Sequence, residues 1–283
     1  MRFRMGPSGN MARERPGRRK GLKTGGQGTG MLQIFADLSA VQGDLLEIRG
    51  EDYNHIRNVL RMKPGEELLV RNPDGSGEES LVGRFAIDSF TEDSVRLRLV
   101  SLQESEVELP VRVLLFQGLP KADKMDLIVQ KAVELGAAGI VPVEMHRSIV
   151  KLTGDKRRKR VARWQAIAEA AAKQSKRALI PEIHDIMTMK EAVDFAAAEA
   201  DWIFVPYERM ADEKETGTRA LLDQVRPGQT TAVFIGPEGG FEEAEVRAAV
   251  ERGARTVSLG RRILRTETAG LAFLSFMIYR FEL

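Results

Sequence analysis

The feature that most constrains the fold is an alternation of short apolar runs with amphipathic stretches, which begins at Val111 and continues to the C-terminus. The apolar runs predict strands at residues 111–116, 140–143, 202–206, 231–235 and 257–259. Helical spacing occupies much of the intervening chain, at residues 123–135, 155–177, 242–252 and 266–280. Strands joined through helices pair in parallel, and the helices cover both faces of the sheet. The pattern therefore predicts an α/β domain over residues 111–283.

Residues 31–102 have a different pattern, with short strand-like runs and turn signals. The runs lie at residues 33–35, 45–49, 67–71, 80–88 and 94–102. One helical piece at 52–61 interrupts them, and the turn-forming sequence Asn72-Pro-Asp-Gly-Ser-Gly separates two of them. This arrangement predicts a small β-barrel domain. The acidic segment 103–110 ends in Pro110 and is interpreted as a linker.

Residues 1–30 contain 8 Lys and Arg against 1 Asp and Glu, and they hold few large apolar side chains. A segment of this composition cannot bury a core and is expected to be disordered. Two interpretations stay open: a basic arm that binds RNA, or a start site placed upstream of a chain that begins near Met31. The rest of the chain is mildly acidic, with 35 basic and 40 acidic residues. Binding to nucleic acid would therefore depend on a local patch.

Several classes of site are excluded by composition. The chain has no cysteine, so it has no disulfide, thiolate metal site or cysteine nucleophile. Its three histidines, at 55, 146 and 184, lack the spacing of metal ligands, and we expect no metal. The motifs of P-loop nucleotidases, dinucleotide-binding domains and serine hydrolases are missing. No run approaches the roughly 18 apolar residues that predict a membrane helix, and no secretory signal is present, which indicates a cytoplasmic protein.

The first candidate site follows the expected strand 231–235 and consists of Gly236, Pro237, Glu238, Gly239, Gly240 and Phe241. Glycines permit close approach to a ligand and positive φ angles. The N–H groups of the helix that begins at Glu242 favour a carboxylate. Glu238 would repel a phosphate, so a zwitterionic or cationic ligand fits better. The alternative is a structural turn that only caps the helix.

The second candidate site follows the expected strand 257–259 and runs from Gly260 through Arg265 and Glu267 to Ala269. Thr266, or the residue before it, could cap the final helix. Arg265 does not complement the dipole of that helix, which argues for a role beyond structure. The alternative is a solvated basic loop. Because both loops follow strands of one parallel sheet, we expect them at the same sheet edge.

A third feature is basic. Residues 144–177 contain 11 Lys and Arg and 3 Asp and Glu, a density suited to phosphate contacts. The alternative is a solvated helix face. The local excess within an acidic body favours RNA or another polyanion.

Several motifs together resemble the small-subunit (16S) ribosomal RNA uridine-N3-methyltransferase family, a branch of the SPOUT superfamily of knotted methyltransferases. The strongest are Gly236-Pro-Glu-Gly-Gly-Phe and Leu259-Gly-Arg-Arg-Ile-Leu-Arg-Thr-Glu-Thr-Ala. Further likeness lies in the helix from Lys121 to Gly136, in Arg147-Ser148, Arg163-Trp164 and Gln174-Ser-Lys-Arg, and in His55 with Val59-Leu-Arg-Met-Lys-Pro-Gly. The resemblance covers residues 31–283.

The resemblance implies a PUA-like β-barrel at 31–102 that binds RNA and a trefoil-knot methyltransferase domain at 111–283. It also implies a homodimer, and the apolar residues of the last helix, Leu271, Phe273, Leu274 and Ile278, are a plausible interface. Threaded chains are rare, and pattern reasoning alone would have rejected a knot. The cofactor implied is S-adenosylmethionine, held by Gly236, Pro237, Glu238, Gly239, Gly240, Leu259, Gly260, Ile263 and Leu264.

The acceptor implied is uracil N3 in 16S ribosomal RNA of the small subunit, and no metal is required. Methylation at pyrimidine C5 would need a thiolate, which this chain lacks. We expect Arg265 to stabilise charge on the uracil carbonyls and Glu267, less so Glu238, to accept a proton. Expected RNA contacts are Arg57, Arg61, Lys121, Arg147, Arg157, Arg158 and Arg177.

Two other functions stay open at this point. A non-enzymatic ribosome-assembly protein could use the β domain and the basic patch, and it would bind RNA without a cofactor. A related knotted methyltransferase could instead modify transfer RNA or a ribose oxygen.

Overall fold

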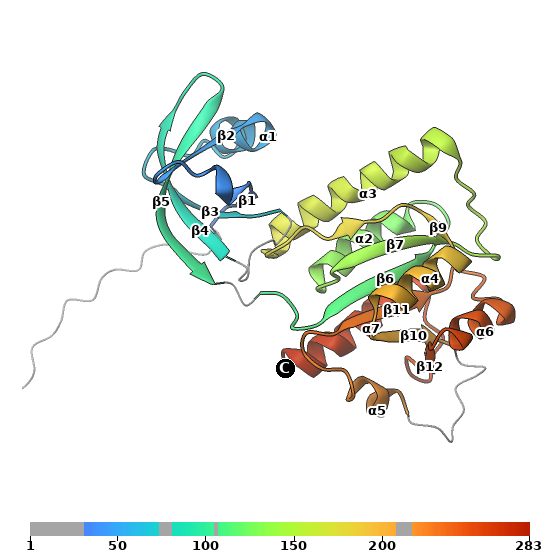
Figure 1. Cartoon of the computed structure of the whole chain (residues 1–283). Coiled ribbons are helices and arrows are strands. Elements are labelled where there is room, and N and C mark those ends of the chain that lie inside the picture. The colour runs from blue at the N-terminus through green and yellow to red at the C-terminus, as the bar shows by residue number, and fades with distance from the viewer. Residues whose placement is uncertain (1–30, 74–80, 105–106, 208–216) are drawn as a thin grey trace, which may run out of the picture. The chain divides into compact units, whose positions relative to one another are not determined.

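Residues 33–104 form a five-stranded sheet in the computed structural model, which describes residues 31–73, 81–104, 107–207 and 217–283 (Figure 1). The strands are β1 (Gln33–Phe35), β2 (Leu45–Arg49), β3 (Glu67–Arg71), β4 (Leu81–Phe90) and β5 (Ser94–Glu104). Their order is β1-β3-β4-β5-β2, and every neighbouring pair except β1–β3 is antiparallel. Alternate side chains such as Leu68, Val70 and Phe85 face a common core. The β character expected for this region is confirmed.

The helical piece expected at 52–61 is divided in two. An α-helix, α1 (Gly50–Asn54), continues directly into a short π-helix, η2 (His55–Val59). A separate 3-10 turn, η1 (Leu38–Ala40), lies earlier in the chain, between β1 and β2. Ile56 of the π-helix is fully buried and fills the core of the sheet. The chain then turns at Arg61, which has a φ of 53°. Arg61 therefore lies just beyond the helical segment, which the sequence predicts to include it.

Seven strands form the second sheet, and all of their pairings are parallel, as predicted. Its main path runs β12-β10-β11-β6-β7-β8, with β9 also paired to β7. The bounds are β6 (Arg112–Gly118), β7 (Gly139–Glu144), β8 (Glu182–Ile183), β9 (Met187–Thr188), β10 (Trp202–Pro206), β11 (Thr230–Ile235) and β12 (Arg255–Val257). The central strand β11 is buried along its whole length. Continuous apolar runs of this kind are typical of a parallel sheet covered on both faces.

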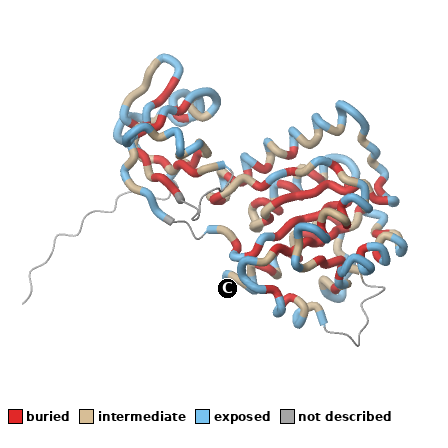
Figure 2. Tube along the Cα trace, viewed as in Figure 1, coloured by how far each residue is buried: buried red, intermediate tan, exposed pale blue. Residues whose placement is uncertain are grey.

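Helices cover both faces of this sheet (Figures 1 and 2). One face packs against α2 (Lys124–Glu134), α3 (Gly154–Ser175) and α7 (Thr266–Phe281), and the other against α4 (Met189–Glu199) and α6 (Glu243–Glu251). Successive residues of β11 divide between the layers: Val233 faces the first and Phe234 the second. A short helix, α5 (Thr218–Leu222), adds Leu222 to the first layer. Figure 2 shows the buried strands between two exposed helical layers.

The chain returns from the edge of the sheet to its middle near the C-terminus. Strand β12 pairs only with β10, yet helix α7 packs over β11 and β6. Gly260, with a φ of 110°, lies in the segment that makes this return. A trefoil knot requires such a path, because the last segment must cross back over chain that is already laid down. The α/β fold class with a mostly parallel sheet is confirmed, and this return of the chain is the path that the resemblance to knotted methyltransferases implies.

Helix α4 is missing from the sequence-based expectations. Its N-terminus has a complete capping box, in which Thr188 and Glu191 satisfy each other's backbone N–H groups. The Thr-x-x-Glu spacing is a recognisable start signal, and the alanine-rich stretch that follows obscured the apolar period. The boundary of the β domain also differs from the expectation. Strand β5 extends to Glu104, two residues beyond the expected end of that domain. The domain limits at 102 and 110 stay predictions, and residues 1–30 lie outside the described part of the chain.

Two residues expected at a dimer interface lie inside the chain instead. Phe273 and Leu274 of α7 are fully buried against the sheet, whereas Leu271 and Ile278 are half-buried. The exposed apolar side chains at the end of this region are Tyr279 and Leu283. None of the helices in the described ranges is long and apolar enough to cross a membrane.

Candidate active site

The glycine loop Gly236–Phe241 leaves the carboxyl end of β11 and turns back on itself. The N–H of Gly240 donates to the carbonyl of Pro237 at 2.8 Å, and Gly240 has a φ of 68°. A Cβ on Gly236 would lie 3.2 Å from the backbone of Gly240, a tight contact that would require the loop to shift by a few tenths of an ångström. Behind the loop, Gly118 at the end of β6 lets Pro237 approach closely.

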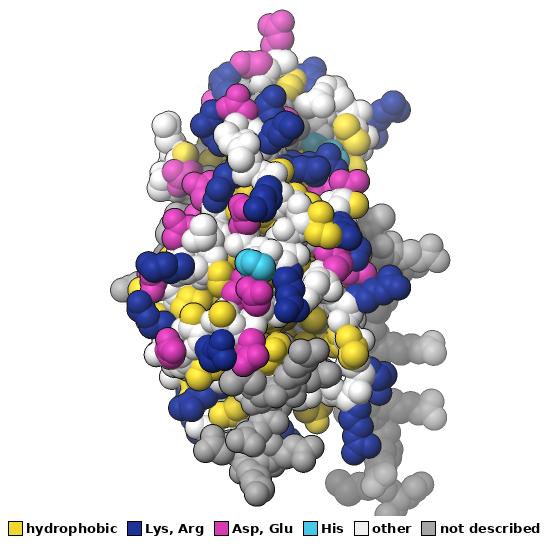
Figure 3. Space-filling model, turned by 90° about the vertical axis from the view of Figure 1, so that its right-hand side faces the viewer, with side chains coloured by type: hydrophobic (Ala, Val, Ile, Leu, Met, Phe, Trp, Pro, Cys, Tyr) yellow, Lys and Arg dark blue, Asp and Glu magenta, His cyan; other side chains and the backbone are white. Residues whose placement is uncertain are grey.

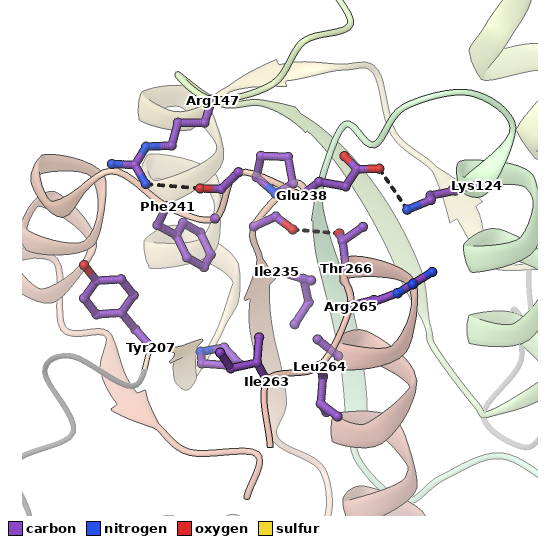
Figure 4. A pocket seen from close by; sticks show the side chains of 16 residues that line it. Lys124, Arg147, Tyr207, Ile235, Glu238, Phe241, Ile263, Leu264, Arg265 and Thr266 are labelled. Atoms are coloured by element: carbon purple, nitrogen blue, oxygen red, sulfur yellow. Dashed lines mark hydrogen bonds and ion pairs between the residues drawn. The ribbon is translucent and has the colours of Figure 1, made fainter. Parts of the chain in front are cut away.

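The start of helix α7 is joined to this loop by a buried hydrogen-bond chain. Gln117 Nε2 donates to Thr266 Oγ1 at 2.9 Å, and Thr266 Oγ1 donates to the carbonyl oxygen of Gly236 at 2.7 Å. Thr266 therefore does not cap the helix with its side chain. The N-cap residue is Arg265, which makes no side-chain capping bond and is free to point elsewhere. Figure 4 shows Thr266 facing the loop and Arg265 extending past it.

The two glycine-bearing loops line one cavity of about 650 Å³. The walls combine backbone of the glycine loop with apolar side chains from four different segments (Figure 4). The lining residues are Lys124, Arg147, Pro206, Tyr207, Ile235, Gly236, Pro237, Glu238, Gly239, Gly240, Phe241, Ile263, Leu264, Arg265, Thr266 and Ala269. The prediction that both loops meet at one sheet edge is therefore confirmed.

The cavity has a charged edge at the start of α2. The Lys124 ammonium lies 3.1 Å from a carboxylate oxygen of Glu238 and 3.1 Å from one of Glu267. Hydrogen bonds to Glu238 and then to Glu267 raise the pKa of Lys124. The other oxygen of Glu267 lies 4.0 Å from the Arg265 guanidinium. Four charged groups from three segments thus form one cluster.

Both carboxylates of this cluster are held in the ionised form. The backbone N–H of Glu267 itself, followed by Lys124 and then Arg265, lowers the pKa of the Glu267 carboxyl below its ordinary 4.5. Burial acts to raise the pKa of Glu238. Hydrogen bonds from backbone N–H groups and from Lys124 outweigh that effect, and the pKa of Glu238 is also lowered. A carboxylate of lowered pKa is a weak proton acceptor, which limits either residue as a base.

Arg147 comes from the segment after β7 and reaches the far side of the glycine loop. Its guanidinium donates to the carbonyl of Gly239 at 3.1 Å (Figure 4). The sequence singled it out for RNA contact. The structure places it at the cavity wall.

Most residues expected to hold a cofactor lie at the cavity. Gly236 through Gly240, Ile263 and Leu264 line it, whereas Leu259 and Gly260 lie earlier in the second loop and are not among the lining residues. The N-terminus of α6 differs from expectation. Glu242 and Glu245 form a capping box there, so the backbone N–H groups of these two residues are already occupied. Of the two expected catalytic residues, Arg265 lines the cavity. Glu267 is not among the lining residues, but it pairs with Lys124, which is.

Sequence reasoning missed Lys124 and Tyr207 as cavity residues. Phe241 and Thr266 belong to the two candidate loops, and both line the cavity. Tyr207 follows β10, whose carboxyl end shares the same sheet edge. Lys124 had no local signal, because its carboxylate partners lie 114 and 143 positions away.

The expected RNA contacts are spread over several surfaces. Arg158 is exposed but paired with Asp155, and Arg160 lies 3.6 Å from Asp123. Arg57 is held over the rings of Tyr53 and Phe90. Lys121 donates to the Glu238 carboxylate through its backbone N–H, and its side-chain ammonium takes no part in that bond. On the face seen in Figure 3, Lys and Arg side chains are interspersed with Asp and Glu.

Arg177 requires a correction. It is 3% exposed, and its guanidinium binds the Glu108 carboxylate and the carbonyls of Val133 and Ala137. These acceptors satisfy a cation that cannot remain in water, so Arg177 stabilises the domain and does not face RNA. Its basic neighbours in the sequence gave no sign of this, because the partners come from distant segments.

Two families of RNA methyltransferase domains match this chain. The family model described as RNA methyltransferase domain matches residues 107–278, and that described as RNA methyltransferase PUA domain matches residues 48–77. The ribosomal RNA small subunit methyltransferase E of Bacillus subtilis (strain 168) is 35% identical over 257 residues, covering 89% of this chain and 98% of the relative. The chain belongs to the ribosomal RNA small subunit methyltransferase E family.

Solved structures agree with this assignment. The ribosomal RNA small subunit methyltransferase E of Neisseria gonorrhoeae, bound to S-adenosyl methionine, superposes with a TM-score of 0.74 at 29% identity and covers 89% of this chain and 98% of its own. A putative methyltransferase of Legionella pneumophila in complex with the same cofactor has a TM-score of 0.74 at 30% identity, covering 88% and 98%. Both matches extend over nearly the whole length of the solved chains.

Proposed function

We propose that this chain transfers the methyl group of S-adenosylmethionine to N3 of a uridine in the 16S RNA of the small ribosomal subunit. The observation that carries the proposal is the single cavity lined by both Gly236–Phe241 and Ile263–Thr266. Relatives named for methylation of small-subunit ribosomal RNA, and neighbours bound to S-adenosylmethionine, support the donor and the class of acceptor. The choice of uracil N3 rests on the resemblance of the two loop motifs.

The residues around the cavity fit this cofactor. A volume of about 650 Å³ is within the range of small-molecule sites. Ile235, Leu264 and Ala269 provide an apolar wall for a purine ring, and glycine backbone offers hydrogen-bonding groups at close range. Charges of both signs stand at the cavity, with Glu238 beside Lys124 and Arg265 nearby, which suits a zwitterionic ligand. A nucleoside that carries an amino acid and a sulfonium has this chemistry.

The chain's own groups would act on the acceptor base. When bound, S-adenosylmethionine supplies a methyl carbon on a positively charged sulfur, which leaves with the electrons of the carbon–sulfur bond as N3 attacks. Arg265, which is 83% exposed and beside the cavity, would stabilise the negative charge that spreads onto the uracil carbonyls as N3–H loses its proton. Glu267 is the candidate acceptor of that proton, with its lowered pKa as the limit on this role. Alignment of N3 with the methyl group would supply much of the rate.

RNA would be held by the small β domain and by exposed cations at the start of α3. Arg157, Arg158 and Arg160 lie there, and the ion pairs of Arg158 and Arg160 are exposed enough to exchange for phosphate. We further propose a homodimer and action in the cytoplasm, where the small subunit is assembled. Tyr279 and Leu283 are the exposed apolar residues that such a dimer would cover.

The decisive experiment is methyl transfer from tritiated S-adenosylmethionine to small subunits of a strain that lacks this activity, followed by nucleoside mass spectrometry. The expected product is 3-methyluridine. A 2′-O-methylated nucleoside would indicate the ribose-directed alternative, and RNA binding without any transfer would indicate an assembly protein. Arg265→Ala should bind S-adenosylhomocysteine normally and lose about 100-fold in kcat. Near-full turnover of that variant would remove Arg265 from the chemistry.

A further inference from the structure

One ammonium group connects two carboxylates from loops that are far apart in the sequence. Lys124, the first residue of α2, lies 3.1 Å from Glu238 of the glycine loop and 3.1 Å from Glu267 of helix α7. Figure 4 shows Lys124 pointing toward Glu238 along the cavity edge. Three segments that wall the cavity therefore meet at Lys124.

Each carboxylate has a second partner that fixes its orientation. Glu238 accepts a hydrogen bond of 3.1 Å from the backbone N–H of Lys121. Glu267 has one oxygen on Lys124, and the other lies 4.0 Å from the guanidinium of Arg265. Of the pair Glu267 and Arg265, Glu267 is the more buried, with a side chain 17% exposed against 83% for Arg265. The buried carboxylate is thus placed to hold the exposed arginine.

We propose that Lys124 is a positioning residue for methyl transfer, which holds Glu267 so that Glu267 in turn holds Arg265 at the cavity. The proposal rests on the function argued above, in which Arg265 faces the acceptor base. It gives Glu267 a role in orienting a cation, alongside or in place of proton transfer.

The charges of the cluster explain why loss of Lys124 would act on geometry. Without the ammonium, Glu238 and Glu267 would be two neighbouring carboxylates with no cation between them, and they would repel each other. Glu267 would then turn toward Arg265, its remaining cation, and draw it from its place. The ion pairs are about one-third exposed on the lysine side, so they contribute little to folding stability. The effect should therefore fall on the rate of transfer.

The test compares Lys124→Met, Lys124→Arg and the control Lys131→Met. Lys131 lies on the same helix and pairs with Glu134, away from the cavity. For Lys124→Met we expect kcat to fall about 100-fold, as misplacement of a reacting group does, with KM for S-adenosylmethionine and the Kd of S-adenosylhomocysteine within about 3-fold. Lys124→Arg should recover most of kcat, and Lys131→Met should match the wild type.

A double variant tests whether Lys124 acts through Glu267. If it does, Lys124→Met with Glu267→Gln should be no slower than the slower single variant, because both remove one arrangement. Additive losses, an unchanged kcat in Lys124→Met, or no recovery in Lys124→Arg would overturn the proposal. If Lys124→Met does not fold, Lys124→Gln replaces it in the same comparison, and a kcat within about 3-fold of the wild type in that variant would overturn the proposal. Absence of methyl transfer by the wild type would instead refute the proposed function itself.

Discussion

Thr266 Oγ1 donates a 2.7 Å hydrogen bond to the carbonyl oxygen of Gly236, 30 residues earlier in the chain. This bond ties the start of the last helix to the first residue of the glycine loop. Gln117 completes the chain by donating to Thr266 at 2.9 Å. Gln117 and Thr266 are buried, and Thr266 and Gly236 line the cavity, so these bonds help to set the spacing of the two loops.

Replacing Thr266 with valine should destabilise the fold while preserving its shape. The change leaves the Gly236 carbonyl without its Thr266 donor and leaves the Gln117 amide with its 3.0 Å bond to the Gly118 carbonyl but not with Thr266, at a cost of about 1–3 kcal/mol. Chemical denaturation followed by fluorescence would measure this. Thr268→Val, at an exposed position of the same helix, is the control and should change stability by less than about 0.5 kcal/mol. Equal losses in both variants would show that the hydrogen-bond chain contributes nothing.

A methyl group at Gly118 should displace the glycine loop from behind. The added Cβ would lie 2.7 Å from Pro237 and 2.9 Å from the sulfur of Met145, so Pro237 must move. Calorimetric titration of S-adenosylhomocysteine should show at least about 10-fold weaker binding, since loss of a few contacts costs about 1.4 kcal/mol. Gly217→Ala meets no atom within 4 Å and should bind as the wild type does. Unaltered affinity in Gly118→Ala would mean that the loop position does not govern binding.

Arg177→Met should destabilise the methyltransferase domain and leave the salt dependence of RNA binding unchanged. It strands the Glu108 carboxylate and two carbonyls in the interior, a loss of about 3–5 kcal/mol for a broken buried pair. Urea denaturation would measure it. Arg158→Met, on the exposed face of the preceding helix, should cost less than about 1 kcal/mol. A stable Arg177→Met that binds RNA with a reduced salt slope would restore Arg177 as an RNA contact.

Charge reversal of Arg157, Arg158 and Arg160 should weaken RNA binding through lost phosphate contacts. Each lost contact lowers the slope of log K against log salt by about 0.7–0.9, so the triple variant should lose about 2–3 in slope. Binding to small-subunit RNA across a range of salt concentrations would measure this slope. Reversal of Lys190, Arg219 and Arg247 is the control with the same change in net charge, since each of them lies on another helix and pairs within it. The same slope in both triple variants would make the start of α3 an ordinary solvated surface.

Much of this architecture was predictable because it depends on local spacing. Apolar runs separated by amphipathic helices require a parallel sheet, and Val233 and Phe234 pack into opposite layers as strand geometry demands. The two glycine-bearing loops follow strands of that sheet, so their meeting at one edge also followed from the sequence. Helix α4 was missed although its Thr188–Glu191 capping box is written in the sequence. The knot came from resemblance alone, because no local period encodes a crossing of the chain.

The sequence by itself determined the two domains' patterns, the glycine loops and the chemistry that the absence of cysteine excludes. Only the tertiary structure decided which side chains meet: Lys124 with Glu238 and Glu267, and Thr266 with Gly236. It also decided that Arg177 is buried while the similar residue Arg158 is exposed. The physical reason is the strand order β12-β10-β11-β6, which brings together segments more than 100 residues apart. Helical and strand periods report which face of an element is apolar, but the partner across that face depends on the order in which the strands pair.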